Sequence, residues 1–337
     1  MKKRGGISAG GNWLLDVIKV VDTYPKEGNL ANILETKPPS NGGCPYNVLL
    51  DIAKLETGIP LQGIGALGDD KAADYILNDC KTNGINTKLL HKKQGEVTSY
   101  TDVFNVKETG YRTFFHGRGA NAFLDINDFD TNKISGRICL LGYLLLLDTL
   151  DTEDAKFGTR AAALLSKLSE EGIETAIDIV SEDSERFSKI VMPALPYVDY
   201  LIINEVEASK TLNIAVRDDS GSLIEDNIAK VAELLIQHGV RKQVIIHYPE
   251  GSFSHRVKDN EQIFEKSLVL PKDFIVGATG AGDAFCAGTL YGIYSEWDTK
   301  KTLQFASGMA AASLSEAPAS LGIRPIDEIW EIIENYS

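Results

Sequence analysis

The sequence predicts an α/β fold built on a mostly parallel β-sheet, and two observations lead to that prediction. Short apolar stretches rich in β-branched residues alternate with longer stretches of helical periodicity along most of the chain. Strands separated by helices of this length imply βαβ crossovers, which bring successive strands parallel to one another. The chain also has no repeat of fixed period and no low-complexity segment, so a repeat architecture is not indicated.

The elements follow in chain order from these two kinds of pattern. A helix is expected from Pro45 to Leu55, because proline fits the first turn of a helix. Glycines at positions 172 and 239 end two of the later helices, as glycine often does. The remaining expected strands are 61–66, 137–141, 175–180, 200–203 and 243–247, and the remaining helices are 71–83, 160–171 and 227–238.

Two segments break the alternation and predict a second, smaller β-structure. Residues 16–33 begin with a strand-like stretch and continue into a loop with proline, glycine and asparagine. Residues 98–115 have the pattern of a hairpin with its turn at 107–110. Neither segment carries a crossover helix, so we interpret them as a β flap beside the main sheet, where it could cover a ligand. The alternative is that both are ordinary hairpins at a sheet edge.

Composition and charge limit the possible partners. The 337 residues are 43% hydrophobic and 24% charged, which is ordinary for a folded globular protein. With 34 basic and 48 acidic residues the net charge is −14, so neither nucleic acid nor an anionic membrane surface is expected as a partner. A few free amides and one cation could still bind a small anion. The four widely spaced cysteines are expected to be reduced, and the expected location is the cytoplasm.

The most informative stretch for chemistry is residues 277–285, with the sequence GATGAGDAF. It follows apolar stretches at 267–270 and 274–276, which we interpret as strand, and it precedes a helix. Three glycines let successive N–H groups point into one concavity at a helix N-terminus, which suits a phosphate. A Walker A loop would end in Gly-Lys-Ser/Thr, and the dinucleotide fingerprint has a different glycine spacing.

Asp283 stands inside this loop, where a carboxylate would repel a bound phosphate. One explanation is structural, because an acidic residue in the first turn of a helix is favoured by the helix dipole by ~0.3–1 kcal/mol. The other is functional: a base beside a transferring phosphoryl group takes the proton from the attacking hydroxyl. The loop by itself leaves both explanations open.

Three motifs in order resemble the ribokinase-like (PfkB) carbohydrate kinases. The first comprises Asn41-Gly-Gly43, Asn47 and residues 65–70, the second is Asn204-Glu-Val-Glu207, and the third is Thr279-Gly-Ala-Gly-Asp283. The resemblance extends over about residues 10–325. It implies a single ribokinase-like domain over residues 1–337, a three-layer α/β/α sandwich. It also implies a small β-sheet lid formed by about residues 14–40 and 97–118.

The resemblance assigns roles around the glycine-rich loop. In the family, the aspartate corresponding to Asp283 is the catalytic base, and amides corresponding to Gly280, Ala281 and Gly282 stabilise the transferring charge. The same loop, with Thr279, faces the nucleotide. Asn204 and Glu207 correspond to residues that organise Mg²⁺, often through water, and Asn204 also belongs to the nucleotide side. Their local alternative is a helix cap, since Asn followed three residues later by Glu is a capping pattern.

The sugar side is likewise implied by the resemblance. The expected substrate ligands are Asp16, Gly42, Gly43, Asn47 and Asp283, since glycines allow close approach and Asp and Asn bind hydroxyls. Arg118 and Asn121, in a Gly-Ala-Asn stretch after the hairpin, are further candidates. Locally, Gly42-Gly43 could instead be a loop before a helix, and Asp16 could face solvent from a strand.

Three positions depart from the family pattern. Gly277-Ala278 replace the usual Asp-Thr near a monovalent-cation site, so a requirement for K⁺ is not carried over to this chain. The usual nucleotide loop is replaced by His247-Tyr-Pro-Glu-Gly251. Ser307 stands where an asparagine is common near adenine. His247, Gly251 and Ser307 are therefore expected on the nucleotide side, without a prediction of which nucleotide.

These motifs predict an ATP- and Mg²⁺-dependent kinase that phosphorylates a hydroxyl of a sugar or sugar acid, with Asp283 as general base. The alternatives are a nucleoside or sugar-phosphate kinase of the same family, or a catalytically silent regulator that binds sugar or nucleotide on the same scaffold. Basic residues for a second phosphate are scarce, with Arg112 and Arg118 the main ones. An exposed flap could also pair two copies into a homodimer.

Overall fold

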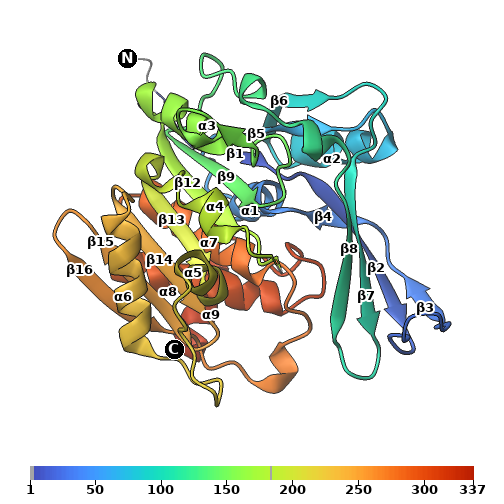
Figure 1. Ribbon diagram of the computed structural model, residues 1–337. Coiled ribbons are helices and arrows are strands. Elements are labelled where there is room, and N and C mark those ends of the chain that lie inside the picture. The colour runs from blue at the N-terminus through green and yellow to red at the C-terminus, as the bar shows by residue number, and fades with distance from the viewer. Residues whose placement is uncertain (1–3, 183) are drawn as a thin grey trace.

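A large, mostly parallel sheet forms the centre of the computed structural model, which describes residues 4–182 and 184–337. Within those ranges nine strands are ordered β16-β15-β14-β13-β12-β9-β1-β5-β6 (Figure 1). Pairing is parallel from β6 across to β14 and antiparallel between β14, β15 and β16. The bounds are β1 Ile7–Gly11, β5 Leu61–Leu67, β6 Ile85–Lys92, β9 Ile138–Leu144, β12 Glu174–Ile179, β13 Tyr200–Asn204, β14 Gln243–Tyr248, β15 Gly251–Arg256 and β16 Glu261–Lys266.

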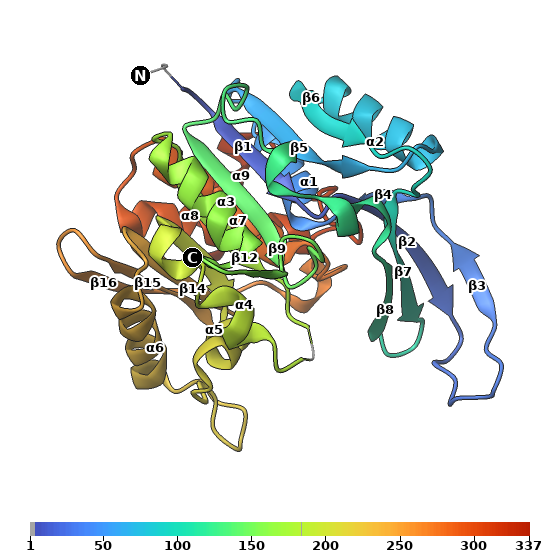
Figure 2. The ribbon, with the colours of Figure 1, turned by 45° about the horizontal axis from the view of Figure 1, so that its top comes forward.

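Helices cover both faces of this sheet, so the predicted three-layer α/β/α sandwich is confirmed (Figures 1 and 2). One face packs against α3 (Arg160–Glu170), α4 (Phe187–Val191), α5 (Glu205–Leu212) and α6 (Glu225–Gln237). The other packs against α1 (Cys44–Lys54), α2 (Lys71–Thr82), α7 (Ala281–Tyr294), α8 (Thr299–Leu314) and α9 (Ile326–Tyr336).

The two apolar layers follow from the alternation of side chains along each strand. In β9, Cys139 and Leu141 belong to the first core, whereas Ile138 and Leu140 belong to the second. Strands β13 and β14 divide in the same way, because successive residues of a strand point to opposite faces. The strands therefore read as continuous apolar stretches in the sequence. In the described part of the chain, no helix combines the length and the apolar character needed to cross a membrane.

One prediction about strands was wrong. Residues 267–270 and 274–276 form no strand, and a short 3₁₀ turn, η4 (Lys272–Phe274), extends into the second segment. Val269 and Val276 are 81% and 61% exposed, so the apolar pattern here does not reflect burial in a sheet. Pro271 also removes a backbone donor that a ladder would need.

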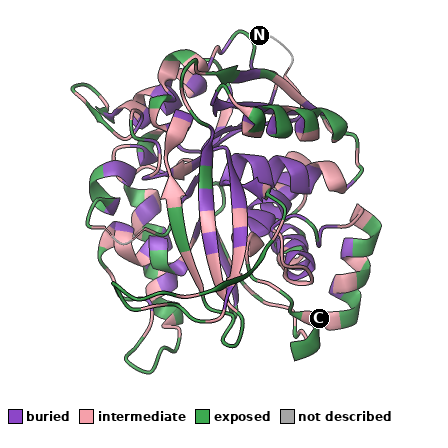
Figure 3. Ribbon diagram, turned by 90° about the vertical axis from the view of Figure 1, so that its right-hand side faces the viewer, coloured by how far each residue is buried: buried purple, intermediate pink, exposed green. Residues whose placement is uncertain are grey.

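A second sheet stands beside the sandwich, as Figure 2 shows, and it corresponds to the predicted lid. In the described ranges its strands are ordered β3-β2-β7-β8, with β4 also paired to β2. The predicted hairpin is the antiparallel pair β7–β8, and the parallel pair β2–β7 joins it to the first segment. Figure 3 faces the lid, whose strands carry many half-buried and exposed residues. The bounds are β2 Leu14–Val21, β3 Ile33–Thr36, β4 Ser40–Gly42, β7 Ser99–Val106 and β8 Arg112–Gly117.

The lid joins the central sheet through the two residues between β1 and β2, Asn12 and Trp13, and this junction is held firmly. Trp13 is fully buried, stacks on Tyr46 with ring centroids 5.3 Å apart, and donates its indole N–H to the Ile64 carbonyl at 2.8 Å. Asn121 donates to the Asn12 side chain and to the Trp13 carbonyl, and accepts from the Trp13 N–H. These contacts set the direction in which β2 leaves the sandwich.

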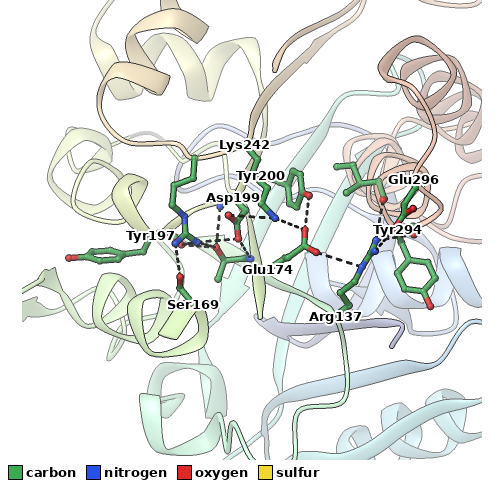
Figure 4. Close-up of polar contacts among 12 residues, drawn as sticks. Arg137, Ser169, Glu174, Tyr197, Asp199, Tyr200, Lys242, Tyr294 and Glu296 are labelled. Atoms are coloured by element: carbon green, nitrogen blue, oxygen red, sulfur yellow. Dashed lines mark hydrogen bonds and ion pairs between the residues drawn. The ribbon is translucent and has the colours of Figure 1, made fainter. Parts of the chain in front are cut away.

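A polar network ties together the amino ends of the central strands (Figure 4). Asp199, just before β13, accepts the Thr175 N–H at 2.9 Å and lies 3.1 Å from the Arg241 guanidinium. Glu174, at the start of β12, accepts from the Tyr200 hydroxyl at 2.7 Å and from the Lys242 ammonium at 2.8 Å. The network lies at the end of the sheet opposite the carboxyl ends, so its expected role is in stability.

Asp199→Ala is expected to lower the free energy of unfolding by about 2–3 kcal/mol, because the Thr175 amide and the Arg241 guanidinium lose a buried partner. Denaturant unfolding at neutral pH measures this loss. Glu296→Ala is the matched control: Glu296 pairs with Arg137 in the same network, but its carboxylate is 80% exposed, and a change below about 0.5 kcal/mol is expected. Equal losses in both variants would contradict this assignment.

Candidate active site

A cavity of about 710 Å³ opens at the carboxyl ends of the central strands, between the sandwich and the lid. Strands β12, β13 and β14 end there with Asp178, Asn204 and His247. Ligands of open α/β sheets bind at this position, because the loops after the strands converge there. Ten of the residues predicted from the sequence line this cavity: Asp16, Gly43, Asn47, Asn204, Glu207, His247, Thr279, Gly280, Gly282 and Asp283.

A second cavity of about 480 Å³ adjoins the first. The two share Asn204, His247, Ala278 and Gly282 in their walls, so the amino end of α7 lies between them. The second cavity is also lined by the remaining residues predicted for the nucleotide side, Gly251 and Ser307, and by Ala281 of the predicted catalytic loop. Its other walls are mainly apolar and include Phe285, Leu268 and Leu314, which suits a flat ring system.

The glycine-rich loop gives α7 an open amino end. Gly280 has φ 83°, and a Cβ atom there would lie 2.5 Å from Ala319 Cβ, so only glycine fits without displacement. The first bond of the helix runs from the Ala284 N–H to the Gly280 carbonyl at 2.8 Å. The amides of residues 281–283 therefore precede the first intrahelical donor and can face an anion.

Asp283 is 5% exposed and lies in the first turn of α7, facing the larger cavity. Its Oδ2 accepts from the Asn47 amide at 2.7 Å, and its two oxygens accept from the Tyr143 hydroxyl at 3.1 and 3.2 Å. Burial raises the pKa of Asp283 to about 6, while hydrogen bonds from Asn47, Tyr143 and Cys44 oppose that rise. The carboxylate is thus ionised at neutral pH and can take up a proton.

Tyr143 reaches Asp283 because the chain bends sharply at the end of β9. Tyr143 has φ 62° and Leu145 has φ 82°, both in the left-handed region that favours glycine. Holding a non-glycine residue there costs on the order of 1–3 kcal/mol, so the surrounding structure must compensate. Strain of this kind is typical of residues whose side chain is aimed at a functional group.

Three further carboxylates surround Asp283. Burial, together with the charge of Asp283, raises the pKa of Asp16 to about 7. Burial and the charges of Glu207 and Asp283 raise the pKa of Asp178 well above its usual range. Burial is also the largest cause that raises the pKa of Glu207 to about 7. One oxygen each of Asp178 and Asp283 and the Cys44 sulfur lie within 4.8 Å of one another.

This donor set fits a hard cation. Carboxylate oxygens are the ligands that Mg²⁺ prefers, whereas a neutral thiol is not, so Cys44 is unsuited to ligate it. Burial raises the pKa of the Cys44 thiol well above its usual range, which keeps the sulfur protonated. A divalent cation near Asp178 and Glu207 would offset the repulsion between these carboxylates.

Asn204 and Glu207 form a helix cap, the structural role that the sequence offered as an alternative to organising Mg²⁺. The Asn204 side chain accepts from the N–H groups of Val206 and Glu207 at 2.9 Å, and Glu207 accepts the Asn204 N–H at 2.9 Å. Glu207 additionally accepts from the Ser181 hydroxyl at 2.8 Å. Both residues still line the larger cavity, so the cap also holds their oxygens in place beside it.

Three predicted substrate ligands lie outside the walls of both cavities. At Gly42, a Cβ atom would lie 2.3 Å from Leu14 Cδ1 and 2.8 Å from the Asp16 carboxylate, so this glycine makes room for both side chains. Arg118 donates to the Leu145 carbonyl at 3.3 Å and lies 3.4 Å from Asp148. Asn121 is fully buried in the junction at Asn12 and Trp13, where its amide is already bonded.

Tyr143 and Asp178 are the main cavity residues that sequence reasoning missed. Asp178 could have been found, because a single acidic residue near the end of a buried strand, within 175–180, often faces the site. Tyr143 gave no such signal: it lies in the apolar stretch 138–147, and only the bend after β9 turns its hydroxyl toward Asp283.

Comparison with known proteins agrees with this geometry. A family model described as pfkB family carbohydrate kinase matches residues 12–324, nearly the whole chain. The chain belongs to this family. It is therefore a kinase of the carbohydrate type, a phosphotransferase with an alcohol group as acceptor.

Curated relatives of this kinase share about a quarter of its residues. A 5-dehydro-2-deoxygluconokinase of Geobacillus kaustophilus is 24% identical over 314 residues, covering 88% of this chain and 85% of the relative. An uncharacterized sugar kinase of Archaeoglobus fulgidus is 24% identical over 281 residues, covering 80% of this chain and 98% of the relative.

Solved structures with this fold include sugar and nucleoside kinases. Ribokinase of Arabidopsis thaliana, complexed with ribose and ATP, has a TM-score of 0.79 at 20% identity, covering 98% of this chain and 99% of that one. A nucleoside kinase of Methanocaldococcus jannaschii has a TM-score of 0.75 at 17% identity, covering 99% and 100%. The shared fold confirms the ribokinase-like prediction.

Proposed function

We propose that this kinase transfers the γ-phosphoryl group of ATP to a hydroxyl group of a sugar or sugar acid, with Asp283 as general base. The observation that carries the proposal is the position of Asp283. Its buried carboxylate stands beside free amides at the start of α7, where the two cavities meet. A base and a set of anion-binding amides are the two groups that phosphoryl transfer to an alcohol requires together.

In the proposed reaction an acceptor hydroxyl lies against Asp283 and gives its proton to a carboxylate oxygen as the O–P bond forms. The pKa of about 6 leaves Asp283 ionised at pH 7 yet basic enough to hold the proton. The amides of residues 281–283 face the negative charge of the transferred group. Asp16, Gly43 and Asn47 would hold the remaining hydroxyls, since carboxylate and amide groups each bind more than one.

The nucleotide and the metal ion are proposed to occupy the α7 end of the site. The apolar walls of the second cavity, with Ser307 and Gly251, would receive the adenine, and His247 and Thr279 lie toward the phosphates. Asn204, Glu207 and Asp178 would hold Mg²⁺, in part through water, and that ion would neutralise charge on the phosphates. A putative ribokinase II of E. coli with the same fold, TM-score 0.75, has been solved in complex with ATP and Mg²⁺.

The curated relatives also support a sugar acid among the acceptors. Their name, 5-dehydro-2-deoxygluconokinase, denotes a kinase of a gluconic acid derivative. The site of this chain can hold a polyol chain through Asp16 and Asn47 whether or not that chain ends in an acid. The cytoplasm is the proposed location, because all four cysteines are free thiols.

Asp283→Asn is expected to lower kcat by about 10²- to 10⁴-fold, because the amide cannot accept the hydroxyl proton. The measurement is ADP release with MgATP over a panel of sugars and sugar acids, with the phosphorylated product identified by mass spectrometry. Acceptor binding, measured by calorimetry, should remain within a few-fold of wild type. A wild-type chain that binds acceptors tightly and phosphorylates none of them would instead be a silent binding protein.

Tyr143→Phe is expected to shift the acid limb of the kcat/KM profile to higher pH. The Tyr143 hydroxyl bonds the ionised carboxylate of Asp283 and lowers its pKa, so its removal raises that pKa above about 6. The base must be ionised, so activity below pH 7 should fall more than activity at pH 8. Tyr75→Phe, on the exposed face of α2, is the control and should leave the profile unchanged. An unshifted profile in Tyr143→Phe would argue against Asp283 as the titrating base.

We also propose a homodimer that forms through the lid. The lid exposes Ile33, Leu34 and Phe115, each at least 51% accessible, which is unfavourable in a monomer. Phe115→Glu is expected to shift the chain from dimer to monomer in sedimentation experiments. Val269→Glu, at an exposed apolar position outside the lid, is the control and should leave the assembly unchanged. A wild-type chain that sediments only as monomer at high concentration refutes the dimer.

A further inference from the structure

The inner face of the lid carries polar groups that the proposed catalytic chemistry does not use. Arg112, Phe114 and His116 alternate along β8, and all three line the larger cavity. Successive side chains of a strand point to opposite faces, so these three share the face turned toward the site. Across the pair β7–β8, Asn105 lies opposite Arg112 and Thr101 lies opposite His116.

Three of these groups have no partner of their own. The side chain of Arg112 forms no hydrogen bond or ion pair with any described residue, although it is half-buried. The Oδ1 atom of Asn105 and the Nε2 atom of His116 are buried without a hydrogen-bond partner in the described chain. Buried polar groups are almost always bonded, so two buried unpaired atoms next to an unpaired guanidinium indicate that this face binds a polar ligand.

The positive charge of Arg112 on this face is also not paired with the carboxylates of the cavity. Burial alone lowers the pKa of Arg112, and no carboxylate raises it, so none of the cavity acids pairs with the guanidinium. Among the described residues that line the cavity, Arg112 is the one lysine or arginine. The other basic residue singled out in the sequence, Arg118, is already bonded to the Leu145 carbonyl and to Asp148.

We propose that Arg112 binds a carboxylate carried by the acceptor, so that the substrate class of this kinase is sugar acids rather than neutral sugars. A guanidinium presents a planar pair of donors that matches a carboxylate in two parallel hydrogen bonds. Asn105 Oδ1 can accept from a remaining N–H of the guanidinium and hold its orientation. His116 bonds Thr101 through Nδ1 at 3.2 Å, which leaves Nε2 for an oxygen of the acceptor.

A carboxylate fits this face better than a phosphate group does. One guanidinium balances the single charge of a carboxylate, whereas a phosphate dianion would need further cations that the cavity walls do not contain. The remaining charged lining consists of acids, namely Asp16, Asp178, Glu182, Glu207 and Asp283, which would repel a second negative charge. The carboxylate site rests on the proposed function, and it narrows the proposed acceptors from sugars and sugar acids to sugar acids.

The register of the lid sheet also predicts which hydroxyl reacts. Asp16, Thr101 and His116 form one row across strands β2, β7 and β8, and Val20, Asn105 and Arg112 form another. The rows are four residues apart along β2 and β7, which at the usual strand rise is about 13 Å. The row with Asp16 lies near Asp283, and the row with Arg112 lies farther from it. An acceptor that contacts both rows therefore has its acid group and its reacting hydroxyl far apart on its own carbon chain. Phosphorylation is therefore expected at the end distant from the carboxylate.

The test compares acids with neutral polyols of the same length. Calorimetry without nucleotide measures binding of five- and six-carbon aldonic acids and of the matching alditols at constant ionic strength. Wild type should bind at least one acid more tightly than its alditol, by on the order of 10- to 100-fold. Arg112→Gln should remove this preference and leave alditol binding unchanged, and Arg112→Lys should restore part of it. Lys107→Gln, at the exposed tip of the same hairpin, is the matched control for charge and should bind like wild type.

The outcomes separate this inference from the proposed function. Equal binding of acids and alditols by wild type, or equal loss of both in Arg112→Gln, overturns the carboxylate site. Tighter Arg112-dependent binding of sugar phosphates than of aldonic acids overturns it as well, because the anion would then be phosphate. A failure of the kinase proposal appears instead in ADP release, which these binding measurements do not use. Unchanged thermal unfolding of Arg112→Gln excludes a loss of fold as the cause of weaker binding.

Discussion

The site depends on keeping one charged carboxylate, that of Asp283, buried at the first turn of a helix. Burial raises the pKa of this group, and hydrogen bonds from Asn47, Tyr143 and Cys44 oppose that rise and hold the pKa at about 6. This arrangement requires a left-handed backbone conformation at two other positions. Gly280 adopts φ 83° against Ala319, and Tyr143 adopts φ 62° at the end of β9. The amino end of α7 also lies between the two cavities.

The lid completes the site from the other side, and its attachment explains how it can be positioned accurately. Asn121 bonds Asn12 and Trp13, and the Trp13 ring stacks on Tyr46 in α1, the helix that also carries Asn47. The lid strand β2 and the donor that bonds Asp283 are therefore fixed to the same part of the core. As a result, Asp16 on β2 faces Asp283 closely enough for the charge of Asp283 to raise its pKa. A lid held this way can exclude water from the transferring group.

Charge is distributed unevenly in the larger cavity, and this gives the acceptor a direction. The carboxylates gather at the carboxyl ends of the strands and at the base of the lid, where a hydroxyl and a divalent cation would lie. The unpaired guanidinium of Arg112 lies further along the lid, opposite Asn105. The net charge of −14 therefore does not describe the binding site, because one cation without a local partner can determine which anion enters.

The sequence by itself determined the fold class, the lid hairpin and most of the site, because alternating apolar patterns and glycine motifs act locally along the chain. The glycines of 277–285 and Asp283 specify the start of a helix, and this start depends little on contacts with distant parts of the chain. The sequence could not reveal β1, a short strand with Gly10 and Gly11 at its end, which becomes an interior strand of the sheet by pairing with β5 and β9. Nor could it separate Asn121, which bonds the lid junction, from a substrate ligand, place Tyr143 at the site, or tell Arg112, which lines the cavity, from Arg118, which does not. Those roles depend on strand register, on the bend after β9 and on whether a side chain has a bonding partner. Packing between residues far apart in the chain decides all three, and local sequence patterns do not.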